Sequence, residues 1–388
     1  MTMLDRRRFL QTAACSLAAS PLVTPMAFAA LPSDHRLVVV ILRGGMDGLD
    51  VLQPYGDPGL ALLRPDFAIG PAAGAHDLTG FHALHPELAD LLPLWRAGEL
   101  GFAQAVSTPY RDGRSHFDGQ DILEAGTAGE VPSLSRRDGW LNRLLGVLPG
   151  AEGRTAFAIG REDMLLLRGD AAHSSWAPDA RLELEAATRD LLLHVYHDDP
   201  LFRDRAAEAL LLSAKGPEAK PGEGDSVEAL FGFAAEQLSG DSRIAALSIS
   251  GWDTHRGQPR QILRALRRLS NGILTLRDGL GPAWSRTTVL AMTEFGRTAA
   301  QNGSYGTDHG TGGTLIAAGG AIAGGQVWGQ WPGLAESALL DRRDLMPLRD
   351  VRAYAAWALH GLYGVDRRLL STLVFPGLEM GSDPGLLA

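Results

Sequence analysis

Histidine and carboxylate residues recur in this sequence close to apolar runs, where they could bind a metal ion. The candidate ligands are Asp47, Asp253, His255, Glu294 and His309. Aspartate, glutamate and histidine without cysteine form a ligand set that suits zinc, manganese or another divalent ion. The glycines beside them would let the backbone approach closely. This pattern predicts a divalent metal site.

Each candidate also has a structural interpretation. A single aspartate after a strand is more often a helix cap than a ligand, and this applies to Asp47. Asp253 and His255 could form a local hydrogen-bonded turn, and Asp308 with His309 could be a packing pair in a loop. Because the candidates gather at predicted strand ends, we favour one shared site.

Ser115 is the candidate nucleophile. It is predicted to open a helix, where its hydroxyl would lie beside unpaired N–H groups that stabilise an anion. A neighbouring metal would lower the pKa of the hydroxyl and activate it. The alternative is an ordinary N-cap, with Asp118 completing a modified capping box.

The elements that would position these residues alternate between strand and helix. Strands are predicted over 37–42, 101–106, 155–159, 164–167, 243–250, 287–293 and 313–319. Helices are predicted over 86–100, from Ser115 onward, and over 181–214, 226–238, 258–280 and 349–363. This alternation predicts an α/β fold, a mostly parallel sheet with helices on both faces. In such sheets, functional residues collect at the carboxyl edge of the strands.

The first residues have the features of a twin-arginine signal peptide. Arg6-Arg7-Arg8-Phe9-Leu10 precedes an apolar stretch over 12–28 and the small-x-small sequence Ala27-Phe28-Ala29. We expect residues 1–29 to be removed and the protein to be periplasmic, or otherwise exported by the twin-arginine pathway. An amphipathic first helix is the alternative. The single cysteine, Cys15, lies in this segment, so the mature chain has no thiolate site; a lipid anchor on Cys15 is the other interpretation.

Composition limits the partners. The formal net charge is −9 and no basic run is present, which argues against nucleic acid and anionic membrane surfaces. No stretch after the signal peptide reaches about 18 apolar residues, so no membrane span is expected. Residues 30–388 are predicted to form a single domain with a flexible loop near 214–226, where Gly, Pro and Lys concentrate. The oligomeric state is left open.

Residues from about 37 to 365 resemble the DUF1501 family, exported bacterial proteins of unknown function. The motifs that carry this resemblance are residues 42–49 (LRGGMDGL), 55–58 (YGDP), 84–86 (LHP), 115–120 (SHFDGQ), 251–255 (GWDTH), 293–298 (TEFGRT) and 308–310 (DHG). The family is distantly similar to the alkaline phosphatase and sulfatase superfamily. That similarity implies a three-layer α/β/α sandwich, alkaline phosphatase-like, with a metal site at the strand ends.

The resemblance also implies a role for each candidate. Asp47 would be the metal ligand after the first strand, and Ser115 would be the nucleophile. Asp253 and His255 would correspond to an Asp-x-x-x-His pair, at shorter spacing. Glu294-Phe295 would be the counterpart of an Asp-His pair, and His309 would be the late histidine that precedes a strand. Phe295 cannot bind a metal, so one of two metal sites lacks its imidazole. Asp308 or His116 could replace it. One metal, two or none therefore remain open.

Two functions follow from these observations. The first is an exported metal-dependent hydrolase of the phosphatase or sulfatase type, acting on a small-molecule phosphate or sulfate ester. The alternative is a non-catalytic periplasmic binding or assembly protein on the same fold with a degraded metal site. Phe295 favours the alternative, and the clustered Asp253, His255 and His309 favour the enzyme.

Overall fold

The computed structural model describes residues 33–388, with the exception of 112, 130–137 and 178–226. Three predictions lie outside the described residues. They are the signal peptide over 1–29, the helical region over 181–214 and the flexible loop near 214–226.

A nine-stranded sheet forms the centre of the fold, in the order β11-β5-β10-β9-β1-β8-β6-β7, with β12 also paired to β5. Its strands are β1 (Arg36–Arg43), β5 (Leu100–Ser107), β6 (Ala156–Ile159), β7 (Ser174–Trp176), β8 (Ile244–Ser250), β9 (Thr287–Met292), β10 (Gly313–Ala318), β11 (Val327–Trp328) and β12 (Arg349–Asp350). All pairings in it are parallel except those of β10, which runs antiparallel to β5 and β9. The predicted α/β class with a mostly parallel sheet is confirmed.

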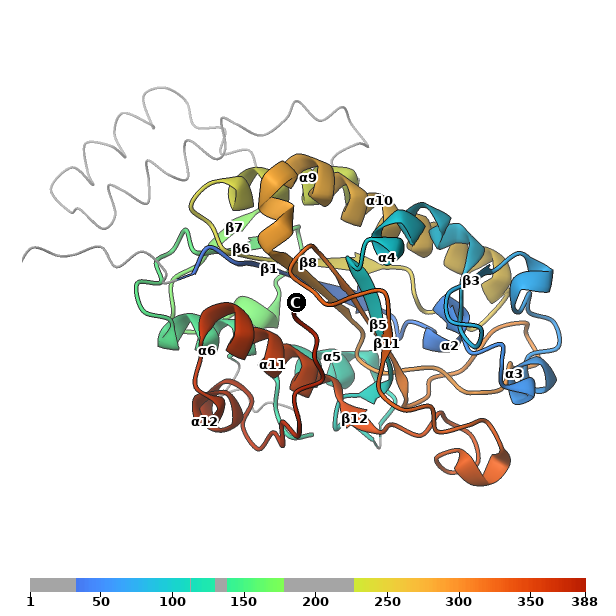
Figure 1. The fold of residues 1–388 in the computed structure, drawn as a ribbon. Coiled ribbons are helices and arrows are strands. Elements are labelled where there is room, and N and C mark those ends of the chain that lie inside the picture. Colours follow the sequence, from blue (N-terminus) through green and yellow to red (C-terminus); the bar gives the residue numbers. More distant parts are fainter. Residues whose placement is uncertain (1–32, 112, 130–137, 178–226) are drawn as a thin grey trace, which may run out of the picture.

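Helices cover both faces of this sheet (Figure 1). On one face lie η3 (Pro86–Leu91), α4 (Leu92–Arg96), α9 (Val227–Ser239) and α10 (Gln258–Leu280). On the other lie α6 (Trp140–Val147), α11 (Val351–Tyr363) and the π-helical turn η7 (Leu370–Val374). Alternate side chains of β1 enter the two cores: Leu37, Val39 and Ile41 on one face, and Val38, Val40 and Leu42 on the other. The fold therefore has three layers, α/β/α.

Shorter elements complete the described chain. A second sheet has the order β2-β4-β3. These elements are α2 (Gly48–Val51), β2 (Leu52–Gln53), α3 (Pro58–Leu63), η2 (Pro71–Ala73), β3 (His76–Asp77), β4 (Ala83–Leu84), α5 (His116–Ala125), η4 (Leu165–Leu167), η5 (Gly281–Arg286), η6 (Glu336–Ala338) and α12 (Arg367–Leu369).

Two sequence predictions differ from the structure. The strand predicted over 164–167 is wrong, because Leu165–Leu167 forms the 3₁₀ helix η4 with all three leucines buried. A short apolar run does not distinguish a strand from a buried helical turn. The helix predicted over 86–100 is two shorter helices that end at Arg96, and Gly98 adopts a left-handed backbone (φ 76°) before β5 begins.

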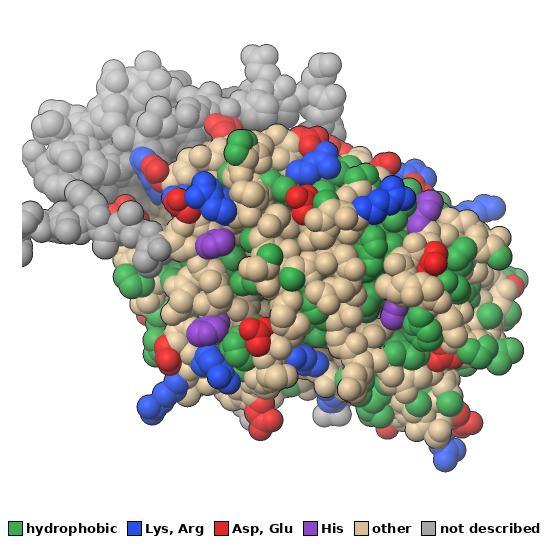
Figure 2. Space-filling view, viewed as in Figure 1, with side chains coloured by type: hydrophobic (Ala, Val, Ile, Leu, Met, Phe, Trp, Pro, Cys, Tyr) green, Lys and Arg blue, Asp and Glu red, His purple; other side chains and the backbone are tan. Residues whose placement is uncertain are grey.

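One face of the molecule is mixed in charge. On the face seen in Figure 2, arginine and acidic side chains are interspersed, and neither sign forms a continuous patch. Within the described ranges, no helix is both long and apolar enough to cross a bilayer.

Candidate metal centre

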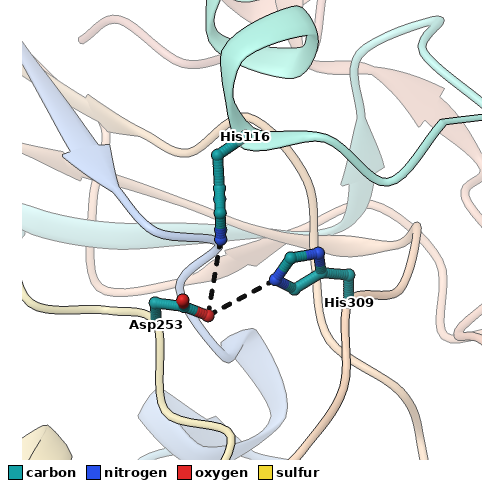
Figure 3. Close-up of side chains that lie close together, drawn as sticks. All are labelled: His116, Asp253 and His309. Carbon is teal, nitrogen blue, oxygen red and sulfur yellow. Dashed lines mark hydrogen bonds and ion pairs between the residues drawn. The ribbon is translucent and has the colours of Figure 1, made fainter.

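Three side chains from distant parts of the chain meet at one edge of the sheet. His116 opens α5, Asp253 follows β8, and His309 precedes β10 (Figure 3). Each offers one ligand atom, and these atoms lie within 4.8 Å of one another. The Nε2 atoms of His116 and His309 lie 3.4 and 3.3 Å from Oδ1 of Asp253.

The sheet topology explains why these residues meet. β1, β8 and β9 are parallel, so their carboxyl ends lie at the same edge. Because β10 runs the opposite way, the segment before it, with His309, returns to that edge. Gly44, just after β1, has φ 119°, and a Cβ there would lie 2.6 Å from the backbone nitrogen of Asp253. Only glycine permits this approach.

A third imidazole lies beside this group. Nε2 of His255 is 3.1 Å from Oδ1 of Asp253 and 2.9 Å from Nε2 of His309. The predicted ligands Asp253, His255 and His309 are thus brought together, and His116 joins them.

Each of the three imidazoles is held at its other nitrogen by an acceptor. Nδ1 of His116 lies 2.7 Å from Glu294 Oε1, and Nδ1 of His309 lies 2.7 Å from the carbonyl oxygen of Arg114. Nδ1 of His255 lies 3.1 Å from Asp308 Oδ1. Carbonyl and ionised carboxylate oxygens only accept, so each Nδ1 carries the proton. In its neutral form, each ring would then present the lone pair of Nε2 to the centre.

A positive species at the centre would fit this arrangement. The Nε2 atoms of His255 and His309 face each other at 2.9 Å, and two lone pairs at that distance repel unless a proton or a metal ion lies between them. Nε2 of His116 is buried and makes no hydrogen bond within the described part of the chain. The ligand atoms that lie within 4.8 Å of one another are an imidazole nitrogen of His116, an imidazole nitrogen of His309 and a carboxylate oxygen of Asp253, a set that suits a divalent metal ion.

The pKa shifts differ between the members of this group. Burial alone would raise the pKa of Asp253, but the hydrogen bond and charge of Arg297, with His116 and His255, lower it to about 2. Burial lowers the pKa of His309, which keeps that ring neutral. The hydrogen bond to Glu294 raises the pKa of His116.

Asp47 has other partners. It is buried and forms a two-point ion pair with Arg64, at 2.8 and 3.0 Å. It also accepts from Gln258 Nε2 at 2.6 Å, and it caps α2 by accepting from the N–H of Leu49 at 3.1 Å. The helix-cap interpretation therefore describes its contacts, and both of its oxygens are engaged.

Glu294 lies next to Nδ1 of His116. It is fully buried, and its Oε1 accepts from the N–H of Gly44 at 2.9 Å and from Gln120 at 3.1 Å as well as from His116. Burial would raise its pKa, but these donors lower it, so the carboxylate is ionised. In this position Glu294 orients the His116 ring.

The ring of Phe295 packs against the imidazoles of His116 and His309. Its ring centroid is 5.1 Å from that of His116, in a stacked arrangement, and 4.8 Å from that of His309. His116 places an imidazole beside Asp253 and His309, where Phe295 has none. The sequence signal for His116 is its place next to Ser115 at a helix start.

Ser115 is the N-cap of α5. Its Oγ accepts from the N–H of Asp118 at 3.4 Å, as the capping interpretation predicts, and its own N–H donates to the Tyr110 hydroxyl at 2.9 Å. It lies between Arg114, whose carbonyl holds His309, and His116. A cap and a nucleophile are compatible at this position, because both use the helix N-terminus.

Arg297 is a site residue that the sequence did not single out. It is buried and donates to Asp253 Oδ1 at 2.7 Å and to the carbonyls of Gly45 and Thr307 at 2.6 and 3.0 Å. It therefore fixes both the ligand Asp253 and the loops around it. Its position in the 293–298 motif was the available signal.

A cavity of about 300 Å³ lies beside α5, the helix that begins at His116. One face of α5 lines it with Phe117, Gln120, Asp121 and Glu124, opposite Glu162. Gln120 connects it to the centre through the hydrogen bond to Glu294.

Comparisons with known proteins place the chain as follows. A family model described as "Protein of unknown function (DUF1501)" matches residues 103–356. No curated protein matches. Three solved structures are similar. A protein in the alkaline phosphatase superfamily from Vibrio parahaemolyticus has 14% identity and a TM-score of 0.39, and the match covers 93% of this chain and 76% of that chain. Ps i-CgsB has 11% identity and a TM-score of 0.40, with 88% of this chain and 75% of that chain covered, and a TAB5 alkaline phosphatase mutant with Mg bound in the M3 site has 12% identity and a TM-score of 0.31, with 74% and 90% covered.

Proposed function

The chain belongs to the DUF1501 family, whose function is unknown, and from its own residues we propose that it is an exported metal-dependent hydrolase of phosphate or sulfate esters. One divalent ion, zinc, would be held by His116, Asp253, His255 and His309. The proposal rests on the Nε2 atoms of His116, His255 and His309, which all lie close to Asp253. The Nδ1 atom of each of these rings lies against a hydrogen-bond acceptor.

A single ion is proposed because the residues available for a second are engaged. Asp47 is paired with Arg64, and Glu294 is held by His116, Gly44 and Gln120. When bound, the ion would polarise the ester oxygen and lower the pKa of a nearby hydroxyl or water.

Ser115 is the proposed nucleophile. A bond would form between its Oγ and the phosphorus or sulfur atom, the ester P–O or S–O bond would break, and the alcohol would leave. The hydroxyl proton would pass through water to the departing oxygen. A second water would then break the bond from Oγ to phosphorus or sulfur, return a proton to Oγ and release inorganic phosphate or sulfate. Because Ser115 caps α5, the N-terminus of this helix would stabilise the negative charge that develops in this attack.

The non-catalytic alternative rested on the missing imidazole at Phe295. The presence of His116 beside Asp253 and His309 weakens that argument, because these three residues could hold an ion without a histidine at 295. A binding or assembly role remains the second candidate, because Asp47 is paired with Arg64 and is therefore not available to bind a metal ion.

The test is to measure zinc content and ester hydrolysis on the same sample. Purified protein is stripped with a chelator, reconstituted with zinc or manganese, and assayed with aryl phosphate and aryl sulfate. About one zinc per chain with metal-dependent turnover is expected. A protein that takes up no metal and is inert on both esters would refute the hydrolase and leave the binding protein.

Export is a separate part of the proposal. It is supported by the arginine pair and the small-residue cleavage sequence within residues 1–29. Replacing Arg6 and Arg7 together by lysine should keep the precursor in the cytoplasm, as fractionation would measure. Unchanged delivery of the double variant would contradict it.

A further inference from the structure

Arg114 has an unusual backbone next to the metal centre. Its φ is 47°, in the left-handed region that residues with a side chain rarely adopt. This conformation places its carbonyl oxygen 2.7 Å from Nδ1 of His309. Residues in such strained conformations cluster at functional sites.

The side chain of Arg114 is exposed, and none of its atoms forms a hydrogen bond or ion pair with any residue that the structure describes. Four other arginines around the centre differ in this respect, because each is paired with a carboxylate: Arg43, Arg64, Arg297 and Arg343. Arg256, next to His255, is exposed as Arg114 is. Arg114 thus combines proximity to His309 with an available guanidinium.

We propose that Arg114 is a specificity-determining residue whose guanidinium binds the anionic phosphate or sulfate group of the ester. This inference rests on the proposed function. The centre is rich in carboxylates, with Asp253, Glu294 and Asp308 around the imidazoles, so an anionic substrate needs added positive charge. The planar guanidinium matches two oxygens of a phosphate or sulfate group. Arg114 directly precedes Ser115, and its carbonyl oxygen contacts His309.

The experiment replaces Arg114 by glycine, which keeps the carbonyl and tolerates the left-handed backbone. Zinc-loaded wild type and variant are titrated with inorganic phosphate in a calorimeter. Zinc content and melting temperature are measured on the same samples. Phosphate binding is expected to weaken about tenfold or more, the effect of losing charge-assisted hydrogen bonds. Zinc content should be unchanged and the melting temperature equal or higher, because glycine relieves the strain.

Arg342→Gly is the matched control. Arg342 also has a left-handed backbone (φ 54°), and its exposed side chain pairs with Glu336 at 3.7 Å. This variant should bind phosphate as the wild type does. Arg114→Lys should bind phosphate more tightly than Arg114→Gly but less tightly than wild type, since lysine keeps the positive charge but lacks the planar guanidinium that can donate two hydrogen bonds to one phosphate.

The outcomes separate this inference from the proposed function. Equal phosphate affinity of Arg114→Gly and wild type would overturn the role of Arg114, whatever the esterase activity. Wild type that binds phosphate through Arg114 but hydrolyses no ester would support Arg114 and refute the hydrolase. A loss of zinc in Arg114→Gly would show that the residue acts on His309 and would overturn anion recognition.

Discussion

Nδ1 of His116 lies 2.7 Å from Oε1 of Glu294, a carboxylate that is completely buried just after β9. The helix α5 thus supplies the imidazole and the sheet supplies the group that orients it. A buried ionised carboxylate on the far nitrogen fixes the tautomer of a ligating histidine and increases its basicity. The pair links the two layers that form the centre.

Glu294→Gln should therefore weaken zinc binding without removing any ligand. The amide keeps the size of the side chain but lacks the charge that holds the His116 ring. Loss of such a partner costs about 10- to 100-fold in metal affinity. Competition with a chromophoric chelator would measure the zinc dissociation constant.

Glu124→Gln is the matched control for that variant. Glu124 is also a buried carboxylate, on α5, but it pairs with Arg43 at 2.8 Å and accepts from the N–H of Leu166. Zinc affinity should be unchanged in this variant, even if its stability falls. Equal losses of affinity in both variants would show a general effect of burying an amide and would remove the role assigned to Glu294.

The strands and the ligand group were predictable to different extents. The run 37–42 predicted a strand buried on both faces, and residues of β1 do enter both cores, because such a strand leaves a continuous apolar sequence. Asp253 and His255 are close in sequence and follow a predictable strand, so their convergence could be expected. His309 was expected because it lies in a loop before a predicted strand, and the resemblance added the same expectation.

Other contacts depend on tertiary pairing that no local pattern shows. Arg64 takes both oxygens of Asp47, although the two residues are 17 positions apart and no spacing rule connects them. The antiparallel direction of β10 is likewise absent from its apolar pattern, because burial on both faces looks the same in either direction. Phe295 was expected to leave a vacancy, whereas packing places it against His116.

Replacing Ser115 tests whether its hydroxyl does chemistry or only caps α5. Ser115→Ala should abolish turnover through a covalent intermediate and also lower the free energy of unfolding by about 1 kcal/mol, the usual cost of a lost N-cap. Ser115→Asn should lose turnover equally but retain stability, since asparagine is an equally good N-cap. Initial rates and urea unfolding would be measured on both variants. Full turnover in either one would assign the attack to water.

Asp50 provides a prediction of pH dependence away from the ligands. It is buried in α2, where burial and the nearby Asp47 raise its pKa despite the hydrogen bond from Gln258 Nε2 at 2.9 Å. A raised pKa in the folded state means that folding favours the protonated form. The stability from Asp50 is thus fully present below its unfolded pKa of about 3.9 and is lost as the pH rises through the folded pKa.

Asp50→Asn should therefore stabilise the protein increasingly as the pH rises. The amide cannot ionise and still offers Gln258 an acceptor. Urea unfolding at pH 4 and pH 8, with chelator present to exclude metal effects, should show a larger gain in unfolding free energy at pH 8. A gain that is equal at the two values, or larger at pH 4, would mean that Asp50 is ionised in the folded state.

Zinc should stabilise the folded protein, and the histidines of the centre should account for that effect. A ligand that binds only the folded state at about 100 times its dissociation constant adds about 2.7 kcal/mol. Wild type should therefore melt at a higher temperature with zinc than with chelator, and His309→Ala should lose most of this difference because an imidazole ligand is gone. The control is His360→Ala, whose Nδ1 lies 2.9 Å from the carbonyl of Val365 in a separate part of the fold. That variant should keep the full zinc-dependent shift even if its own melting temperature falls. A shift that survives in His309→Ala and disappears in His360→Ala would place the zinc elsewhere, whereas the expected pattern ties the metal to the Nε2 atoms that meet at Asp253.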